Sequence, residues 1–185
     1  TSAPPDAAAV DGVAAAPDAD DAAAPPTPDA ELAAYRDARI AMRADLAAGL
    51  DRLRGFVDAY PASRFDVEAR LSIIDCQVRL GRVAAAAPDV DAFLVRFPDS
   101  ERAPEVRFVR AEILRTVHHR CDAARADYRV AATSRRVGDD ARFFLGWCAD
   151  AVGDHDERDR ALTAYLAHAP AGRHAAAAAA LLHRP

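Results

Sequence analysis

The sequence predicts an all-α protein built from stacked helical hairpins. An amphipathic helical pattern that ends at a proline occurs at residues 56–63, again at 93–100 and, more loosely, at 165–170. Proline cannot donate the N–H that the next helical turn requires, so each segment is expected to end a helix. The first two prolines lie 37 residues apart, and the third follows 72 residues later, which is about two further periods. Helix ends that recur at this period are typical of helical-repeat proteins.

The composition fits one domain of ordinary size with an additional tail. Of the 185 residues 51% are hydrophobic, but Ala dominates that share, so the core is expected to consist of closely packed small side chains. The net charge of −5 argues against a protein that binds the phosphate backbone of a nucleic acid. No apolar run is long enough to span a membrane.

Residues 1–26 are predicted to be a disordered linker, and residues 27–185 a helical-repeat domain. The first segment consists mainly of Ala, Pro and Asp, so it cannot bury enough apolar surface to offset the entropy lost on ordering. It either connects the domain to a membrane anchor or another domain, or is a terminus without a role. Because the chain starts at Thr1 rather than Met, we expect that a signal peptide or membrane tether can precede it.

A strong helix start opens the domain. Thr27 can cap the helix and Pro28 suits its first position. Residues 29–60 form either one helix of about 30 residues or a hairpin that turns near Asp45, which would cap the second helix. We favour the hairpin, because a single long helix would leave the first repeat without a partner helix.

The second hairpin is more clearly marked. Asp66 is expected to cap its first helix, and Gly81 to end that helix in the left-handed conformation that glycine tolerates. The return helix runs from about residue 83 to 97, where Pro88 should either kink the helix or delay its start.

The remaining elements follow the same plan. A third hairpin starts between residues 100 and 105 and turns at 118–120, and a fourth starts at Asp139 and turns at 153–154. Residues 172–183, which are almost all Ala, form a last helix whose small side chains suit close docking onto the preceding hairpin.

The cysteines are predicted to be small buried hydrophobic residues. Cys76, Cys121 and Cys148 are odd in number and lack the close spacing of a metal knuckle or a disulfide framework. Cys76 and Cys148 occupy equivalent positions two repeats apart, which is too far for a disulfide in a stacked array.

These motifs resemble the tetratricopeptide-repeat family, in the variant found in periplasmic proteins of outer-membrane assembly and cell division and in domains of bacterial envelope regulators. The most specific signal is an aromatic–Pro–x–Ser sequence at residues 60–63 and 97–100, followed by a helix start. Residues that match the family's Leu–Gly pair, turn glycines, small crossing residues and closing prolines are Leu145, Gly146, Gly81, Gly153, Ala86, Ala123, Pro61, Pro98 and Pro170.

The resemblance covers residues 30–183 and implies a right-handed α–α superhelix of about four hairpins with a C-terminal capping helix. Two departures from the family pattern affect the expected packing. The third unit has Arg135 or Arg136 where its closing proline belongs, and the fourth has Arg158 where the crossing alanine belongs.

No catalytic centre is recognisable, so we expect no enzyme activity, no cofactor and no metal. The sequence has no Gly-rich phosphate loop and no nucleophile elbow. His118, His119 and His155 fall on corresponding turns of adjacent units but lack the i, i+4 spacing of a metal site. Paired carboxylates such as Asp139 and Asp140 fit a helix start better than an acid–base pair.

The resemblance implies that the first helices of successive hairpins line a concave groove that binds a partner segment. The groove residues carried over from the repeat frame are Glu68, Leu71, Asp75, Arg79, Glu105, Phe108, Glu112, Arg115, Asp140, Phe143, Trp147 and Asp150. This set predicts an acidic groove with apolar and aromatic anchors and two arginines, and hence a basic or amphipathic partner segment. Trp147 is the best single candidate, although it can equally be a core residue wedged between the third and fourth hairpins.

We therefore expect a non-catalytic scaffold for protein–protein interaction in the bacterial cell envelope, located in the periplasm by analogy with the family. The alternative is the periplasmic sensory or effector domain of a membrane-anchored regulator of the anti-sigma type. A cytoplasmic location is the alternative to the periplasm, and the oligomeric state is left open.

Overall fold

The computed structural model describes residues 27–184, where it contains α-helices and one short 3₁₀ helix but no β-strand. The helices are α1 (Pro28–Ala44), α2 (Leu46–Ala59), α3 (Asp66–Arg79), η1 (Ala84–Ala86), α4 (Ala87–Arg96), α5 (Ala103–Thr116), α6 (Cys121–Ala131), α7 (Gly138–Ala151), α8 (His155–His168) and α9 (Ala175–Leu182). The predicted linker, residues 1–26, lies outside the described residues. Among the described helices, none combines the length and the apolar character needed to cross a bilayer.

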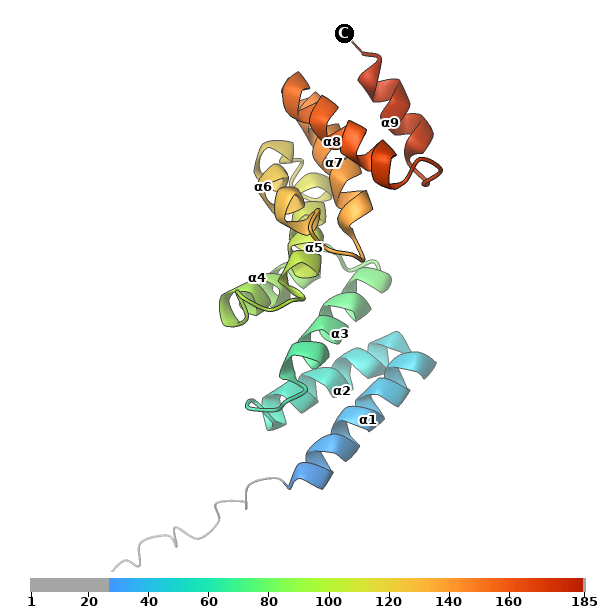
Figure 1. The fold of residues 1–185 in the computed structure, drawn as a ribbon. Helices are drawn as coiled ribbons and strands as arrows, with labels where there is room; N and C mark the ends of the chain where they lie inside the picture. Colours follow the sequence, from blue (N-terminus) through green and yellow to red (C-terminus); the bar gives the residue numbers. More distant parts are fainter. Residues whose placement is uncertain (1–26, 185) are drawn as a thin grey trace, which may run out of the picture.

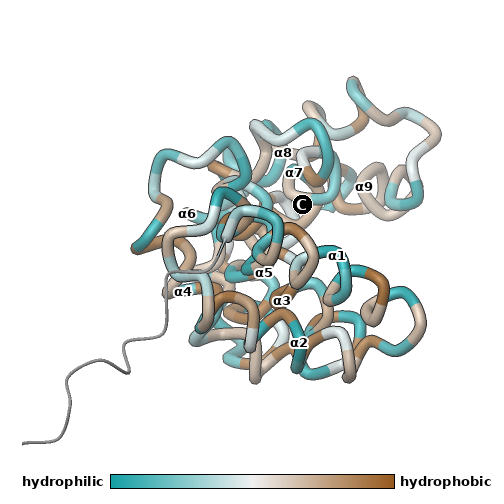
Figure 2. The backbone as a smooth tube through the Cα atoms, turned by 90° about the horizontal axis from the view of Figure 1, so that it is seen from below, coloured by the Kyte–Doolittle hydropathy of each residue, from teal (hydrophilic) through white to brown (hydrophobic). Residues whose placement is uncertain are grey.

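The helices stack in chain order as hairpins α1–α2, α3–α4, α5–α6 and α7–α8, with α9 at the end (Figure 1). Each helix packs mainly against its neighbours in sequence. In Figure 2, which looks along the stack, the hairpins wind around an arc with α1, α3 and α5 towards its inside and α2, α4 and α6 towards its outside. The predicted all-α helical-repeat architecture is therefore confirmed.

The core is divided into four consecutive clusters of apolar side chains. The second helix of each hairpin supplies at least one large, fully buried side chain. Among these are Leu53, Phe93, Tyr128 and Leu162, each with an exposed fraction of 0%. Each cluster lies between neighbouring helices, so every hairpin depends on the next one for burial. This arrangement is expected when a repeat cannot bury its apolar face alone.

The predicted turn at Asp45 and the turn glycines Gly81 and Gly153 are confirmed. The Asp45 carboxylate accepts hydrogen bonds from the N–H groups of Ala47 and Ala48 at 2.7 and 3.3 Å, so it caps α2 and the single long helix is excluded. Gly81 and Gly153 follow α3 and α7 with φ angles of +72° and +79°, the left-handed region in which a side chain would be strained.

The prediction that Asp66 caps α3 is wrong. This residue is the first of the helix, is only 3% exposed, and makes no capping hydrogen bond. Its carboxylate instead accepts hydrogen bonds from Arg70 of α3 and Arg96 of α4, both at 2.7 Å. The two helices of the second hairpin are therefore tied together by a buried ion pair. Pro88 lies in the first turn of α4 after η1, so it delays the helix rather than kinking it.

Small residues set the distance between paired helices. A Cβ atom added to Gly146 of α7 would lie 2.6 Å from the Leu162 side chain of α8, so nothing larger than glycine fits there. Gly49 of α2 lies equally close to α1, a contact that the sequence pattern did not indicate. Ala86 is fully buried as predicted. On α6, however, the predicted Ala123 is only half-buried, whereas its neighbour Ala124 is fully buried.

The arginine that replaces the crossing alanine of the fourth hairpin does not disturb the packing. Arg158 is only 4% exposed, and its guanidinium donates hydrogen bonds to Asp150 at 3.1 Å and Asp159 at 2.8 Å. Because Gly146 provides the close approach on the facing helix, the hairpin accommodates this buried but paired charge.

The prediction that the cysteines are unpaired is wrong for two of them. Cys121 and Cys148 form a disulfide with a Cα–Cα distance of 4.9 Å. They lie on α6 and α7, which belong to successive hairpins and pack against each other. The bond therefore links the third hairpin covalently to the fourth. Cys76 is a buried free thiol, as predicted, and burial raises its pKa above the ordinary value.

Reduction of this disulfide is expected to destabilise the protein by about 3 kcal/mol, because the bond closes a loop of 27 residues in the unfolded chain. Thermal unfolding with and without a phosphine reductant measures the effect, and alkylation followed by mass spectrometry counts the thiols. Alkylation of all three cysteines without reductant would contradict the pairing.

A second prediction concerns Asp127 of α6, which is 3% exposed and accepts hydrogen bonds from Arg107 at 3.1 Å and Arg110 at 2.6 Å on α5. Asp127→Ala should cost about 2–3 kcal/mol of unfolding free energy, because two partly buried guanidinium groups lose their acceptor. The matched control is Asp139→Ala, whose carboxylate is half exposed and pairs with Arg142, and which should cost about 0.5 kcal/mol. Equal losses in urea unfolding would refute the structural role of Asp127.

Candidate interaction groove

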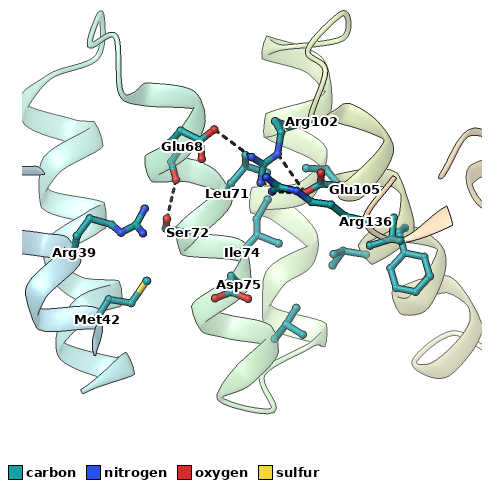
Figure 3. Close-up of a pocket in the computed structure, with 15 residues that line it drawn as sticks. Arg39, Met42, Glu68, Leu71, Ser72, Ile74, Asp75, Arg102, Glu105 and Arg136 are labelled. Carbon is teal, nitrogen blue, oxygen red and sulfur yellow. Dashed lines mark hydrogen bonds and ion pairs between the residues drawn. The ribbon is translucent and has the colours of Figure 1, made fainter. Parts of the chain in front are cut away.

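A pocket of about 540 Å³ opens between the first helices of successive hairpins. Its apolar floor is formed by Met42 of α1, by Leu71, Ile74 and Val78 of α3, and by Val106, Phe108 and Val109 of α5. The three α3 residues are spaced three and four positions apart, which places them on one face of the helix. Figure 3 shows that α1 and α5 flank α3 and that side chains from all three helices point into the pocket.

Charged side chains surround this floor. The carboxylates are those of Glu68, Asp75 and Glu105, and the arginines are Arg39, Arg102 and Arg136. The Arg102 guanidinium bridges Glu68 at 3.4 Å and Glu105 at 3.1 Å, and it therefore ties α3 to the start of α5. The lining holds equal numbers of acidic and basic groups, so the predicted acidic character of the groove is wrong for this pocket.

Arginines balance the charge of the whole set of predicted acidic groove residues as well. Each of the six carboxylates lies within 4.0 Å of an arginine. The pairs are Glu68–Arg102, Asp75–Arg79, Glu105–Arg102, Glu112–Arg115, Asp140–Arg173 and Asp150–Arg158. Two of these partners, Arg79 and Arg115, belong to the predicted groove set. The sequence analysis missed Arg102, Arg158 and Arg173, because they lie outside the first helices of the hairpins.

The spacing of these residues in the sequence could have revealed several of the ion pairs between units. Arg102 follows Glu68 by 34 residues, Arg173 follows Asp140 by 33, and Arg184 follows Asp150 by 34. An acidic residue and an arginine separated by one repeat length occupy corresponding positions on neighbouring units, where their side chains meet.

The predicted groove residues do not all face one site. Five of them line the pocket just described: Glu68, Leu71, Asp75, Glu105 and Phe108. Three line a second pocket: Arg115, Phe143 and Trp147. The remaining four, Arg79, Glu112, Asp140 and Asp150, line neither of these two pockets.

The second pocket, of about 390 Å³, lies between α5, α7 and the terminal helix α9. Trp147 is 40% exposed here, so it is a surface residue and not a core residue. The Arg115 guanidinium carbon lies 4.3 Å from the ring centroid of Phe144 and 5.4 Å from that of Trp147. Contacts of this kind hold a guanidinium in place while leaving an aromatic face available to a partner.

A partly buried network of hydrogen bonds holds the Arg115 side chain in place. Its guanidinium forms an ion pair with Glu112 at 2.6 Å and donates to the Tyr128 hydroxyl at 3.1 Å. Tyr128 donates its own hydrogen bond to Glu112. Burial, together with the Glu112 charge, raises the pKa of Tyr128 well above its ordinary value, so the hydroxyl stays protonated. Glu112, predicted as a groove residue, therefore serves to position Arg115.

The histidines do not form a metal site. His118 and His119 are exposed in the turn after α5, and His155 is exposed at the start of α8. Within residues 27–184, no cluster of three or more His, Cys, Asp or Glu side chains has an arrangement that could hold a metal ion.

Solved structures of similar architecture include helical-repeat proteins. A tetratricopeptide repeat protein from Parabacteroides merdae ATCC 43184 superimposes with a TM-score of 0.67 at 15% sequence identity, over 82% of this chain and 58% of that protein. The present chain thus spans less than two thirds of that relative. The protein MamA superimposes with a TM-score of 0.67 at 20% identity, over 83% of this chain and 81% of MamA.

At these identities the likeness shows the fold alone, and the resemblance to tetratricopeptide repeats is confirmed at that level. No protein-family model matches the sequence, and no curated protein matches it either.

The placement of Trp147 can be tested against its neighbour Phe143, which is only 5% exposed on the same helix. Phe143→Ala should cost about 3–5 kcal/mol of unfolding free energy, as expected for a buried ring. Trp147→Ala should cost about 1 kcal/mol, mainly through the lost contact with Arg115. Chemical unfolding followed by circular dichroism measures both, and a loss for Trp147→Ala as large as that for Phe143→Ala would show that the tryptophan is part of the core.

Proposed function

We propose that this protein is a non-catalytic scaffold that binds a segment of another protein on the inner side of its helical stack. The observation that carries the proposal is the pocket between α1, α3 and α5, whose floor is apolar and open. Leu71, Val78 and Val109 remain half-buried there and pack against the buried cluster that contains Ile74 and Val106. Apolar anchor sites surrounded by polar groups are typical of helix-in-groove and peptide recognition.

The two pockets support one continuous binding surface. Phe108 lines the first and Arg115 the second, and they lie seven residues apart on α5, which puts them on the same face of that helix. A segment that leaves the first pocket along α5 therefore meets Arg115 and Trp147. Tryptophan and arginine are the residue types that most often dominate binding energy at protein interfaces.

The proposed location is the bacterial cell envelope, and the disulfide supports it. Cys121 and Cys148 are bonded in successive hairpins. Stable disulfides form in oxidising compartments such as the periplasm and are rare in the cytosol. The proposal thus combines an extracytoplasmic site of action with a scaffold role.

A photo-activated crosslinking amino acid placed at single positions tests this function in bacterial cells that express the protein. At Val78, in the first pocket, irradiation should yield an adduct with one main partner protein. At Val95, which is 83% exposed on α4 and lies outside both pockets, it should not.

Leu71→Gln, which makes the pocket floor polar without adding charge, should reduce the Val78 adduct. Equal adducts from Val78 and Val95, or an adduct that Leu71→Gln leaves unchanged, would contradict the proposed role of the pocket.

A further inference from the structure

In the described part of the chain, the carboxylates around the first pocket have arginine partners, whereas two of the arginines lack a close carboxylate. This difference indicates what kind of partner fits. Each carboxylate of the pocket already has an arginine partner within the protein. Arg102 holds both Glu68 and Glu105, and Asp75 pairs with Arg79 at 3.3 Å. A basic group on a partner would therefore have to compete with an arginine that is already in place.

Arg39 differs from the other charges. It extends from α1 into the pocket on the side opposite Arg136 (Figure 3). Its Nη1 donates to the Tyr35 hydroxyl at 3.2 Å, but its Nε is buried without a hydrogen-bond partner. Among residues 27–184, no carboxylate oxygen lies within 4.0 Å of the Arg39 guanidinium nitrogens, the distance limit for an ion pair. A guanidinium that a partner covers needs such an acceptor, because burying an unpaired charge is costly.

Arg136 is also weakly held. Its side chain is 63% exposed and lies 3.6 Å from Glu105, a carboxylate that Arg102 already approaches to 3.1 Å. It comes from the segment that precedes α7 and reaches over α5 towards the pocket (Figure 3). Within the described residues, the charged groups of the pocket that have no carboxylate partner or only a distant one are therefore the donors Arg39 and Arg136.

We propose that the first pocket binds an apolar segment that carries a carboxylate, an Asp or Glu side chain, which pairs with Arg39. Apolar side chains on either side of this carboxylate cover the floor formed by α3 and α5, and Arg136 adds attraction from the opposite rim. An acidic group gains these donors without breaking an existing ion pair, whereas a basic group meets Arg39 as a like charge. This inference rests on the proposed function and reverses the basic partner that the sequence predicted.

Two matched pools of short peptides with blocked ends test the inference on the full-length chain. Both pools contain Leu, Ile, Phe and Ser, and one also contains Glu where the other contains Lys. Fluorescence anisotropy should show that the Glu pool binds about tenfold more tightly than the Lys pool. Arg39→Gln should weaken binding of the Glu pool about tenfold, and Arg136→Gln about threefold.

Arg43→Gln is the matched control, because this arginine is exposed on the same helix and does not line the pocket. It should leave binding of both pools unchanged. Arg136→Gln alters an exposed side chain, so it tests the charge preference even if the Arg39 variant fails to fold.

Three results would overturn the inference. If the Lys pool binds as well as the Glu pool, and Leu71→Gln weakens both, the preference for acid is wrong while the pocket's role in binding stands. If Leu71→Gln affects neither pool, the proposed function fails as well. If a synthetic peptide of residues 1–26, which contain five Asp and no Arg, binds through Arg39 more tightly than the Glu pool, the occupant is this chain's own segment and not a partner.

Discussion

No hairpin of this protein can bury its apolar side chains alone, and the rest of the structure follows from that constraint. The core is a row of clusters, each completed by the next hairpin, and helices approach closely where Gly49, Ala86 or Gly146 leaves room. Because burial runs along the stack, Leu71 and Val78 of α3 and Val109 of α5 are left only partly covered on the inner side. The open apolar floor of the groove is the consequence of this one-dimensional packing.

Arginine–carboxylate pairs join the units where apolar contacts end. Asp66 and Asp127 link helices within a hairpin, and Glu157 of α8 receives Arg129 of α6 at 2.5 Å across the boundary between two hairpins. These carboxylates are almost fully buried, so removal of their partners would leave costly unpaired charges. Arginines pair in the same way with the carboxylates around the groove. Arg39 differs, because it has no carboxylate partner among the residues that the structure describes.

Features written in short stretches of sequence were predictable, whereas those that join distant residues were not. The turn at Asp45 and the glycine at Gly81 depend on local backbone conformation, and both were identified correctly. Asp66 looked like a helix cap because its arginine partner Arg96 lies 30 residues away. The disulfide was missed because equivalent positions in different repeats were compared, while Cys121 and Cys148 occupy different positions on neighbouring helices. For the groove, the repeat frame identified the lining helices and two of the arginines, but not Arg102 and Arg136, which precede α5 and α7.

The most direct measurement of the central claim, that a partner segment lies on the inner side of the stack, is hydrogen–deuterium exchange with and without a bound acidic, apolar peptide. The account predicts slower exchange in α1, α3 and α5, whose side chains line the first pocket, and little change in α2, α4 and α6. Protection confined to α2, α4 and α6 would contradict it, because these helices lie on the outside of the arc.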